Sequence, residues 1–387
     1  MTTRSCCRLL ALALVALVAG CGGSARPHVA VTPTPIPLVP PHSFPPSPGT
    51  GGPNIVFVLT DDLSSDLLRF MPHVRALERE GTSFSRYVVS DSLCCPSRTS
   101  IFTGRLPHDT GVFTNVPPDG GFRAFMRNGN VRRTFARTLR ARGYRTALMG
   151  KYLNGYHASR GGIPLGWTDW SGSANGYAGY DYTLDQNGTP AYYGHRPTDY
   201  ITDVLAYQAR SFVDQAAHKD RPFMLELATF APHRPAVPAF RDRALFAGLR
   251  APRGPAFNRP NRHPPLWLAG RTARRAGVLA SIDRRYRRRA QSVVAVDEMV
   301  GSLRRSLQAT GEAADTYFVF SSDNGYHMGE HRLLPGKLTA FDSDVRVPLI
   351  VTGPGVPGSR RVGALPQDTH TTPTSAALTR ARPGPRA

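Results

Sequence analysis

Five short runs of apolar residues recur along the chain, and a polar turn follows most of them. Each run has the length of a strand, and continuous apolar character is typical of strands buried on both faces of a sheet. The runs are Asn54–Thr60, Thr146–Met149, Phe223–Thr229, Thr316–Ser321 and Pro348–Thr352. We therefore predict a central sheet whose strands come from most of the chain length.

Between these runs lie longer segments with a helical pattern. We expect helices over Val131–Arg142, Pro197–Ala217 and Arg284–Thr310, the first and last closed by Gly143 and Gly311 in the manner of C-cap glycines. Strands that alternate with helices favour an α/β sandwich around a mainly parallel sheet. In such sheets, ligands bind beyond the carboxyl ends of the strands.

The first 20 residues have the layout of an export signal. Arg4 and Arg8 precede the apolar run Leu9–Val18, and the small residues Ala19 and Gly20 follow it. The run is too short to cross a bilayer as a stable helix. We therefore expect residues 1–20 to be a signal peptide.

The tetrad that ends at Cys21, Val18-Ala19-Gly20-Cys21, resembles a bacterial lipobox. The resemblance implies that Cys21 carries lipid and anchors an exported protein to the outer face of the cell membrane, with plain secretion as the alternative. Residues 21–52 are dense in Pro, Gly and Ser and are expected to be an extended tether. The catalytic domain is expected to cover residues 53–387.

Composition and charge limit which functions are possible. The 387 residues are 41% hydrophobic, which suffices for one large domain or two modest ones. The formal net charge is +21, and only three of the 48 basic residues are lysines: Lys151, Lys219 and Lys337. An arginine excess suits a polyanion such as a sulfated glycan, although coding bias also produces one. Zinc-finger spacing, RNA-binding motifs and a basic helix followed by heptads are missing, so we expect no nucleic-acid partner.

Cysteine usage points to chemistry rather than to crosslinking. Of five cysteines, two lie within the signal peptide and Cys21 would carry lipid, which leaves Cys94 and Cys95. Adjacent cysteines rarely pair with each other. An exported chain with a single Cys-Cys pair inside a conspicuous motif therefore indicates a reactive residue.

Polar residues suited to catalysis or metal binding follow four of the expected strands. Carboxylate and amide oxygens suit a hard cation, calcium or alternatively magnesium, better than zinc. Taken alone, Asp61-Asp62 and Asp323-Asn324 could also be ordinary turn or capping residues. The polar residues are Asp61 and Asp62 after the first strand, Lys151 after the second, His233 after the third, and Asp323 and Asn324 after the fourth.

The segment from Cys94 to Arg105, CCPSRTSIFTGR, places a nucleophile just before a helix that Pro96 would open. A helix N-terminus favours an anion such as a bound sulfate. Together with Thr103-Gly104, the string resembles the signature of the sulfatases of the alkaline-phosphatase-like superfamily. Four stretches are similar to the N-acetylglucosamine-6-sulfatase branch of that family: residues 61–62, 94–104, 150–154 and 322–327.

The resemblance covers residues 54 to about 385 and implies a sulfuric ester hydrolase acting on a sulfated sugar or glycan. A formylglycine-generating enzyme would oxidise Cys94, and not Cys95, to formylglycine, whose hydrate attacks sulfur. Arg98 would stabilise the formylglycine. Lys151 would bind sulfate, while His233 and Lys337 would lie on its leaving-group side. The implied metal ligands are Asp61, Asp62, Cys94, Asp323 and Asn324.

Two features depart from the family pattern. Leu153 stands where many arylsulfatases have a histidine, which fits the glucosamine-6-sulfatase-like branch. Gln367-Asp368 and Pro373-Thr374 resemble the last helix of the large domain, and the chain stops at Ala387, so the usual small antiparallel domain is expected to be largely absent. The alternative functions are a phosphonate or phosphate monoester hydrolase of the same superfamily, and an inactive lipoprotein that binds sulfated polysaccharide.

Overall fold

The computed structural model describes residues 52–159, 162–217 and 221–378. The expected signal peptide, the lipid site at Cys21, the tether up to residue 51 and Lys219 lie outside the described residues. None of the helices in the described part combines the length and apolar character needed to span a membrane.

The described chain forms a ten-stranded sheet in the order β10-β2-β9-β8-β1-β7-β3-β4-β5-β6. The five central strands, β8 to β4 in that order, pair in parallel, and antiparallel pairs lie toward both edges. The predicted parallel sheet is therefore found at the centre. The strands are β1 Asn54–Thr60, β2 Thr82–Phe84, β3 Arg145–Lys151, β4 Asp169–Ser173, β5 Tyr182–Gln186, β6 Thr189–Tyr193, β7 Phe223–Ala228, β8 Thr316–Ser322, β9 Leu349–Thr352 and β10 Arg360–Val362.

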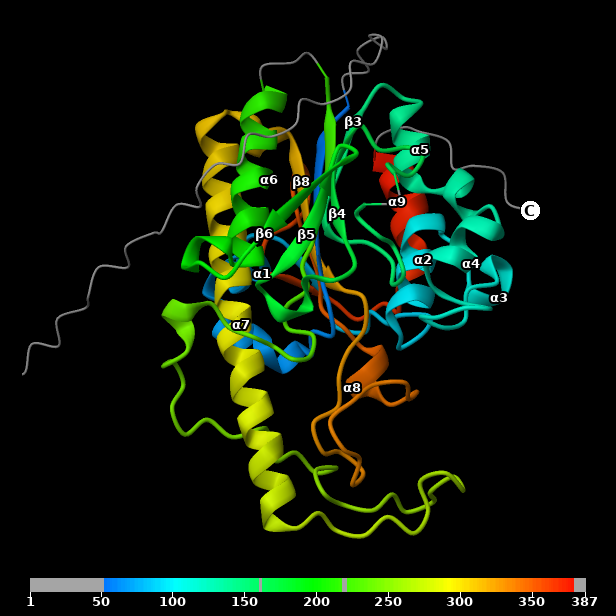
Figure 1. The fold of residues 1–387 in the computed structure, drawn as a ribbon, viewed down its shortest axis with the longest axis vertical. Helices are drawn as coiled ribbons and strands as arrows, with labels where there is room; N and C mark the ends of the chain where they lie inside the picture. The colour runs from blue at the N-terminus through cyan, green and yellow to red at the C-terminus, as the bar shows by residue number, and fades with distance from the viewer. Residues whose placement is uncertain (1–51, 160–161, 218–220, 379–387) are drawn as a thin grey trace, which may run out of the picture. The chain divides into compact units, whose positions relative to one another are not determined.

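Helices cover both faces of the sheet (Figure 1). Helices α1, α6 and α7 pack on one face, and α2, α4, α5 and α9 lie on the other. The α-helices are α1 Pro72–Glu80, α2 Cys94–Thr103, α3 Pro107–Thr110, α4 Gly121–Arg127, α5 Phe135–Arg140, α6 Ile201–Ala217, α7 Ala276–Ala309, α8 Asp342–Val345 and α9 Thr371–Leu378. Short 3-10 turns are η1 Ser65–Phe70, η2 Asn130–Arg133, η3 Gly176–Ala178, η4 Pro197–Asp199, η5 Phe240–Asp242, η6 Glu312–Asp315 and η7 Asp368–His370.

Strand β1 shows why the central strands are apolar throughout. Its side chains alternate between two cores, so Val56 and Val58 pack under α6 and α7, whereas Ile55 and Phe57 pack under α2 and α5. Burying such a side chain contributes roughly 1.5–3 kcal/mol. Because both faces are covered, a polar residue on either face would lose water without a built-in partner.

All five predicted strands are present, while the helix boundaries differ more. Helix α7 begins at Ala276, eight residues before the predicted start at 284, because Val278 and Leu279 also pack against the core. The expected helix 131–142 is divided into η2 and α5 by Thr134, which is extended and caps α5 by accepting a hydrogen bond from the Arg137 N–H. Gly311 follows α7 with φ of 80°, as the C-cap prediction requires.

The sheet order brings the carboxyl ends of four strands to one edge. β1 lies between β8 and β7, and β7 lies between β1 and β3. The register places Thr60 beside Ser322, so the residues that follow β1 and β8 emerge next to each other. The polar residues that follow these strands therefore meet, although hundreds of positions separate some of them in the sequence.

Candidate active site

Cys94 is the first residue of α2 and is fully buried. The sequence suggested that the helix opens at Pro96, but it begins two residues earlier. Proline is tolerated at that third helical position, since the first four N–H groups of a helix have no partner within it. The Cys94 Sγ atom lies 3.5 Å from Asp61 Oδ1 and 2.8 Å from Lys337 Nζ. Residue 94 thus faces both an acid and a cation.

The predicted metal ligands lie side by side. The Asp62 N–H donates to Asp323 Oδ1 at 3.1 Å, and the Asn324 amide donates to Asp62 Oδ1 at 2.7 Å. Asp61 completes the group, and all four side chains are at most 1% exposed. Three carboxylates buried together need positive charge nearby, and their all-oxygen character fits a hard divalent cation.

Three basic side chains meet these carboxylates. Lys151 pairs with Asp61 and lies 3.7 Å from Asp323. Lys337 pairs with Asp62 and donates to Asn324 Oδ1 at 3.3 Å. The third cation, Arg98, donates from Nε to Asp323 Oδ2 at 2.8 Å. Three cations therefore balance three carboxylates within one buried cluster.

The two adjacent aspartates, Asp61 and Asp62, have pKa values shifted in opposite directions. Burial and the nearby Asp323 raise the pKa of Asp61, even though Lys151 opposes the shift. Burial would also raise the pKa of Asp62, but Lys337 and His233 outweigh it and lower that pKa. For the Cys94 thiol, burial and then Asp61 raise the pKa to about 12, so the unmodified thiol is neutral at pH 7.

His233 lies at the rim of this cluster. Its side chain is 23% exposed, and its Nε2 atom is 3.7 Å from Asp62 Oδ2. The ring of Tyr177 packs against the imidazole, with 4.5 Å between the centroids, and lies under the Lys151 ammonium. Ligand atoms of Asp61, Asp62, Cys94 and His233 all fall within 4.8 Å of one another. His233 is thus the member of this group that solvent reaches.

Cys95 has a separate environment. Its Sγ atom contacts Asn154, which accepts at Oδ1 at 3.3 Å and donates its N–H at 3.2 Å. The Cys95 N–H donates to Asn115 Oδ1 at 2.8 Å. Cys94 and Cys95 are both free thiols. Of the two, Cys94 faces the carboxylates and lysines.

Every predicted site residue thus lies in or beside one cluster, and Arg98 also links two strand ends within it. It donates to Asp323 and, from one terminal nitrogen, to the Lys151 carbonyl at 3.0 Å, so it ties the ends of β8 and β3 together. Sequence reasoning missed Tyr177 and Asn115, which lie in turns outside any motif. It also missed Arg289 of α7, which donates to the Asp62 carbonyl and whose only signal was an arginine-rich helix.

Comparisons with known proteins agree with this fold and show the family of the chain. The sulfatase family model matches residues 53–381. This chain belongs to the sulfatase family, as the sequence motifs predicted. Human N-acetylglucosamine-6-sulfatase is 37% identical over 321 residues, which cover 80% of this chain and 57% of that protein. The chain therefore spans little more than half the length of this curated relative.

Two solved structures share the fold. One is a protein in complex with its substrate D-glucosamine-2-N,6-O-disulfate, with a TM-score of 0.71 and 22% identity over 86% of this chain and 77% of that chain. The other is the phosphonate monoester hydrolase of Agrobacterium radiobacter, with a TM-score of 0.64 and 21% identity over 86% of this chain and 74% of that chain. The predicted α/β fold, with a mainly parallel central sheet flanked by helices, is confirmed.

Proposed function

We propose that this protein is a sulfuric ester hydrolase that cleaves sulfate from a sulfated sugar or glycan, with residue 94 as the nucleophile after oxidation of Cys94 to formylglycine. The observation that carries the proposal is the convergence at Cys94 of an all-oxygen ligand group, Lys151 from the end of β3 and Lys337 from the segment between β8 and α8. The name of the human relative and the substrate of the solved complex support a sulfated sugar as the substrate class.

A calcium ion, with magnesium as the alternative, would be held by Asp61, Asp62, Asp323 and Asn324, with residue 94 beside it. Such an ion would supply positive charge beside the sulfate oxygens, and formylglycine would supply the attacking oxygen as a hydrated aldehyde.

The side chains of this protein would position the sulfate and the leaving group. Lys151 pairs with Asp61 beside residue 94, where its ammonium can bind sulfate oxygens, and Lys337 lies 2.8 Å from the Cys94 Sγ atom on the proposed leaving-group side. Arg98 holds Asp323 in place. His233 stands at the solvent-facing rim, where a departing sugar oxygen can receive a proton.

The test combines mass spectrometry with a substrate comparison. The protein is produced in a host that contains a formylglycine-generating enzyme, and the peptide spanning residue 94 is mapped. Sulfate, phosphate and phosphonate esters of the same alcohol are then compared. We expect formylglycine at 94, preferential sulfate release, and loss of activity in Cys94→Ala but not in Cys95→Ala. An active preparation with unmodified Cys94 would contradict the mechanism.

The same assay decides between sulfate and phosphorus esters. The likeness to a phosphonate monoester hydrolase rests on the shared fold, and a site with clustered cations can bind phosphonate as well as sulfate. Faster release from the phosphonate or phosphate ester would replace the sulfatase proposal. Binding of sulfated glycan without turnover of any ester would favour the inactive lipoprotein.

The cellular location is part of the proposal. The signal-like residues 1–20 and the tetrad ending at Cys21 support export and lipid anchoring to the outer face of the cell membrane, with plain secretion as the alternative. Labelling the full chain with radioactive palmitate in a bacterial host tests this directly. We expect label in the wild type and none in Cys21→Ala, while secretion without label would replace the anchor.

A further inference from the structure

A pocket of about 350 Å³ lies beside the active-site cluster, and five of its nine lining residues are arginines. None of the lining residues is acidic. Ser281, Tyr326 and a short Pro-Ala segment complete the wall. The arginines are Arg234, Arg284, Arg285, Arg288 and Arg289.

Four of these arginines come from one face of α7. Arg284 and Arg288, like Arg285 and Arg289, are separated by four residues, so each pair lies on the same side of the helix. Like charges at this spacing destabilise a helix. No carboxylate in the described residues lies within ion-pair distance of these four arginines, whereas the neighbouring Asp283 is paired with Arg253. The positive charge of this face therefore has no ion-pair partner among the described residues.

Hydrogen bonds from Arg289 connect the wall of the pocket to the active-site cluster. Arg289 is 1% exposed and donates to the backbone carbonyls of Asp62 and Pro232. Its guanidinium also lies over the Tyr326 ring, 4.4 Å from the centroid. Its Nε–H has no hydrogen-bond partner among the described residues, although it is buried. Arg234, on the pocket wall, directly follows His233.

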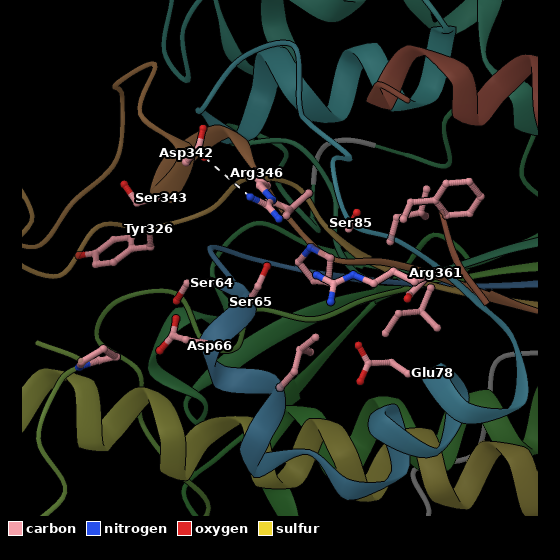
Figure 2. Close-up of a pocket in the computed structure, with 18 of the residues that line it drawn as sticks. Ser64, Ser65, Asp66, Glu78, Ser85, Tyr326, Asp342, Ser343, Arg346 and Arg361 are labelled. Atoms are coloured by element: carbon pink, nitrogen blue, oxygen red, sulfur yellow. Dashed lines mark ion pairs between the residues drawn. The ribbon is translucent and has the colours of Figure 1, made fainter. Parts of the chain in front are cut away.

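A larger pocket, which Tyr326 also lines, contains charges of both signs. It has a volume of about 460 Å³, and both acidic and basic residues line it (Figure 2). Figure 2 shows an ion pair between Asp342 and Arg346, two lining residues four positions apart. The distance between Arg346 Nη1 and Asp342 Oδ2 is 3.8 Å. Four acidic and two basic residues line it, so this larger pocket lacks the purely positive lining of the arginine pocket.

We propose that the arginine pocket is a subsite for a second anionic group of the substrate, a sulfate or carboxylate on a sugar next to the one that is desulfated. The inference rests on the proposed function, and it narrows the substrate class from sulfated sugars to polyanionic glycans. Guanidinium groups suit this role, because they bind sulfate and carboxylate through two parallel hydrogen bonds.

The test compares substrates that differ only in the second anion. The variants are Arg284→Gln, Arg288→Gln and their combination, and the matched control is Arg305→Gln, an exposed arginine on α7 outside the pocket. The substrates are a heparin-type hexasaccharide with all its sulfates, the same hexasaccharide with only the scissile sulfate, and 4-nitrophenyl sulfate. For the fully sulfated substrate, kcat/KM should fall by about 10-fold or more per arginine, the range for hydrogen bonds between charged groups, and far less for the other two.

A binding measurement separates this inference from the proposed function. Calorimetry with the Cys94→Ala protein measures the affinity for the fully sulfated hexasaccharide without turnover, with and without the pocket substitutions. If the wild type cleaves no sulfate ester but the pocket variants still weaken binding, the subsite stands and the proposed function fails. Equal losses on all three substrates, or equal losses in Arg305→Gln, would overturn the subsite. A single-stranded DNA oligonucleotide that competes equally and depends on the same arginines would overturn the glycan assignment.

Discussion

Two regions of the central sheet each contain a fully buried carboxylate, and their surroundings differ. Asp323, at the end of β8, accepts from the Arg98 Nε–H at 2.8 Å and from the Asp62 N–H at 3.1 Å. Glu226, in the middle of β7, has no hydrogen-bond partner for either oxygen among the described residues. Both side chains are completely buried.

The pKa values of these two acids shift in opposite directions. For both, burial raises the pKa. Arg98, Lys151 and Lys337 outweigh burial at Asp323 and hold its pKa well below the usual value. At Glu226, Arg98 opposes burial only partly, and the pKa rises to about 8. Burial alone therefore does not decide the charge of an acid, since a partner at hydrogen-bond distance does.

Asp323→Asn should have the largest effect, because it removes the charge that Arg98 and Lys151 share. Breaking a buried pair typically costs about 3–5 kcal/mol. We expect a loss of this size in urea unfolding, together with at least a roughly 100- to 1,000-fold loss of kcat on 4-nitrophenyl sulfate. Wild-type turnover in Asp323→Asn would mean that Asp323 serves neither the metal nor residue 94.

His233→Ala and Lys337→Ala examine the more accessible rim of the cluster. A sugar alkoxide needs a proton when it leaves, whereas nitrophenol departs without one. We expect kcat/KM to fall by at least about 100-fold on glucosamine 6-sulfate and much less on 4-nitrophenyl sulfate. Equal losses on the two esters would show that these residues bind sulfate rather than protonate the leaving oxygen.

The substitution Glu226→Gln tests the buried acid that has no hydrogen-bond partner among the described residues. The readout is the pH dependence of the unfolding free energy. The raised pKa means that the folded protein holds a proton that the unfolded chain releases above its ordinary pKa. The contribution of Glu226 to the unfolding free energy is fully present at a pH below the ordinary pKa of a glutamate. This contribution is lost as the pH rises toward 8. Between pH 5 and 8, the unfolding free energy of the wild type should fall by up to about 1.4 kcal/mol per pH unit relative to Glu226→Gln.

Urea unfolding of both proteins across this pH range provides the measurement. Glu226→Leu gives a second comparison, because it replaces the acid with an apolar side chain suited to the surrounding core. A difference between wild type and Glu226→Gln that does not vary with pH would show that Glu226 has a partner and stays charged.

Asp342→Asn should have the smallest effect and serves as the surface counterpart of Asp323→Asn. Its side chain is 87% exposed, and its pair with Arg346 spans 3.8 Å. Exposed pairs of this kind contribute little, so we expect a change below about 0.5 kcal/mol in the unfolding free energy. A loss comparable to that of Asp323→Asn would mean that burial is not what makes the Asp323 pair strong.

The contrast also shows what the sequence could predict. Asp61, Lys151 and Asp323 were found because each follows an apolar run, and parallel strands end at one edge of the sheet. Glu226 was overlooked because it lies inside such a run, where it was counted as part of a strand. Its lack of a partner depends on its neighbours Phe57 and Leu148 across the strands, and strand register is not visible in a local pattern.

The contacts of Arg98 were unpredictable for a similar reason. The motif placed Arg98 four residues after Cys94, which puts both residues on one side of a helix. Its bonds to Asp323 and to the Lys151 carbonyl depend on how α2 packs across β8 and β3. The start of α7 at Ala276 was also missed, since packing of Val278 and Leu279, rather than a capping residue, extends the helix.

The complete burial of Cys94 has a consequence for the timing of biosynthesis. An enzyme cannot reach a side chain with no exposed surface, so the proposed oxidation of Cys94 would have to precede folding of this region. Lys337, which covers the thiol, lies 243 positions further along the chain. At roughly 5–20 residues per second of synthesis, the ribosome needs about 10–50 s to reach it. Under the proposed mechanism, the nascent chain would offer residue 94 for modification during that interval, and a protein that folded first would keep the thiol enclosed.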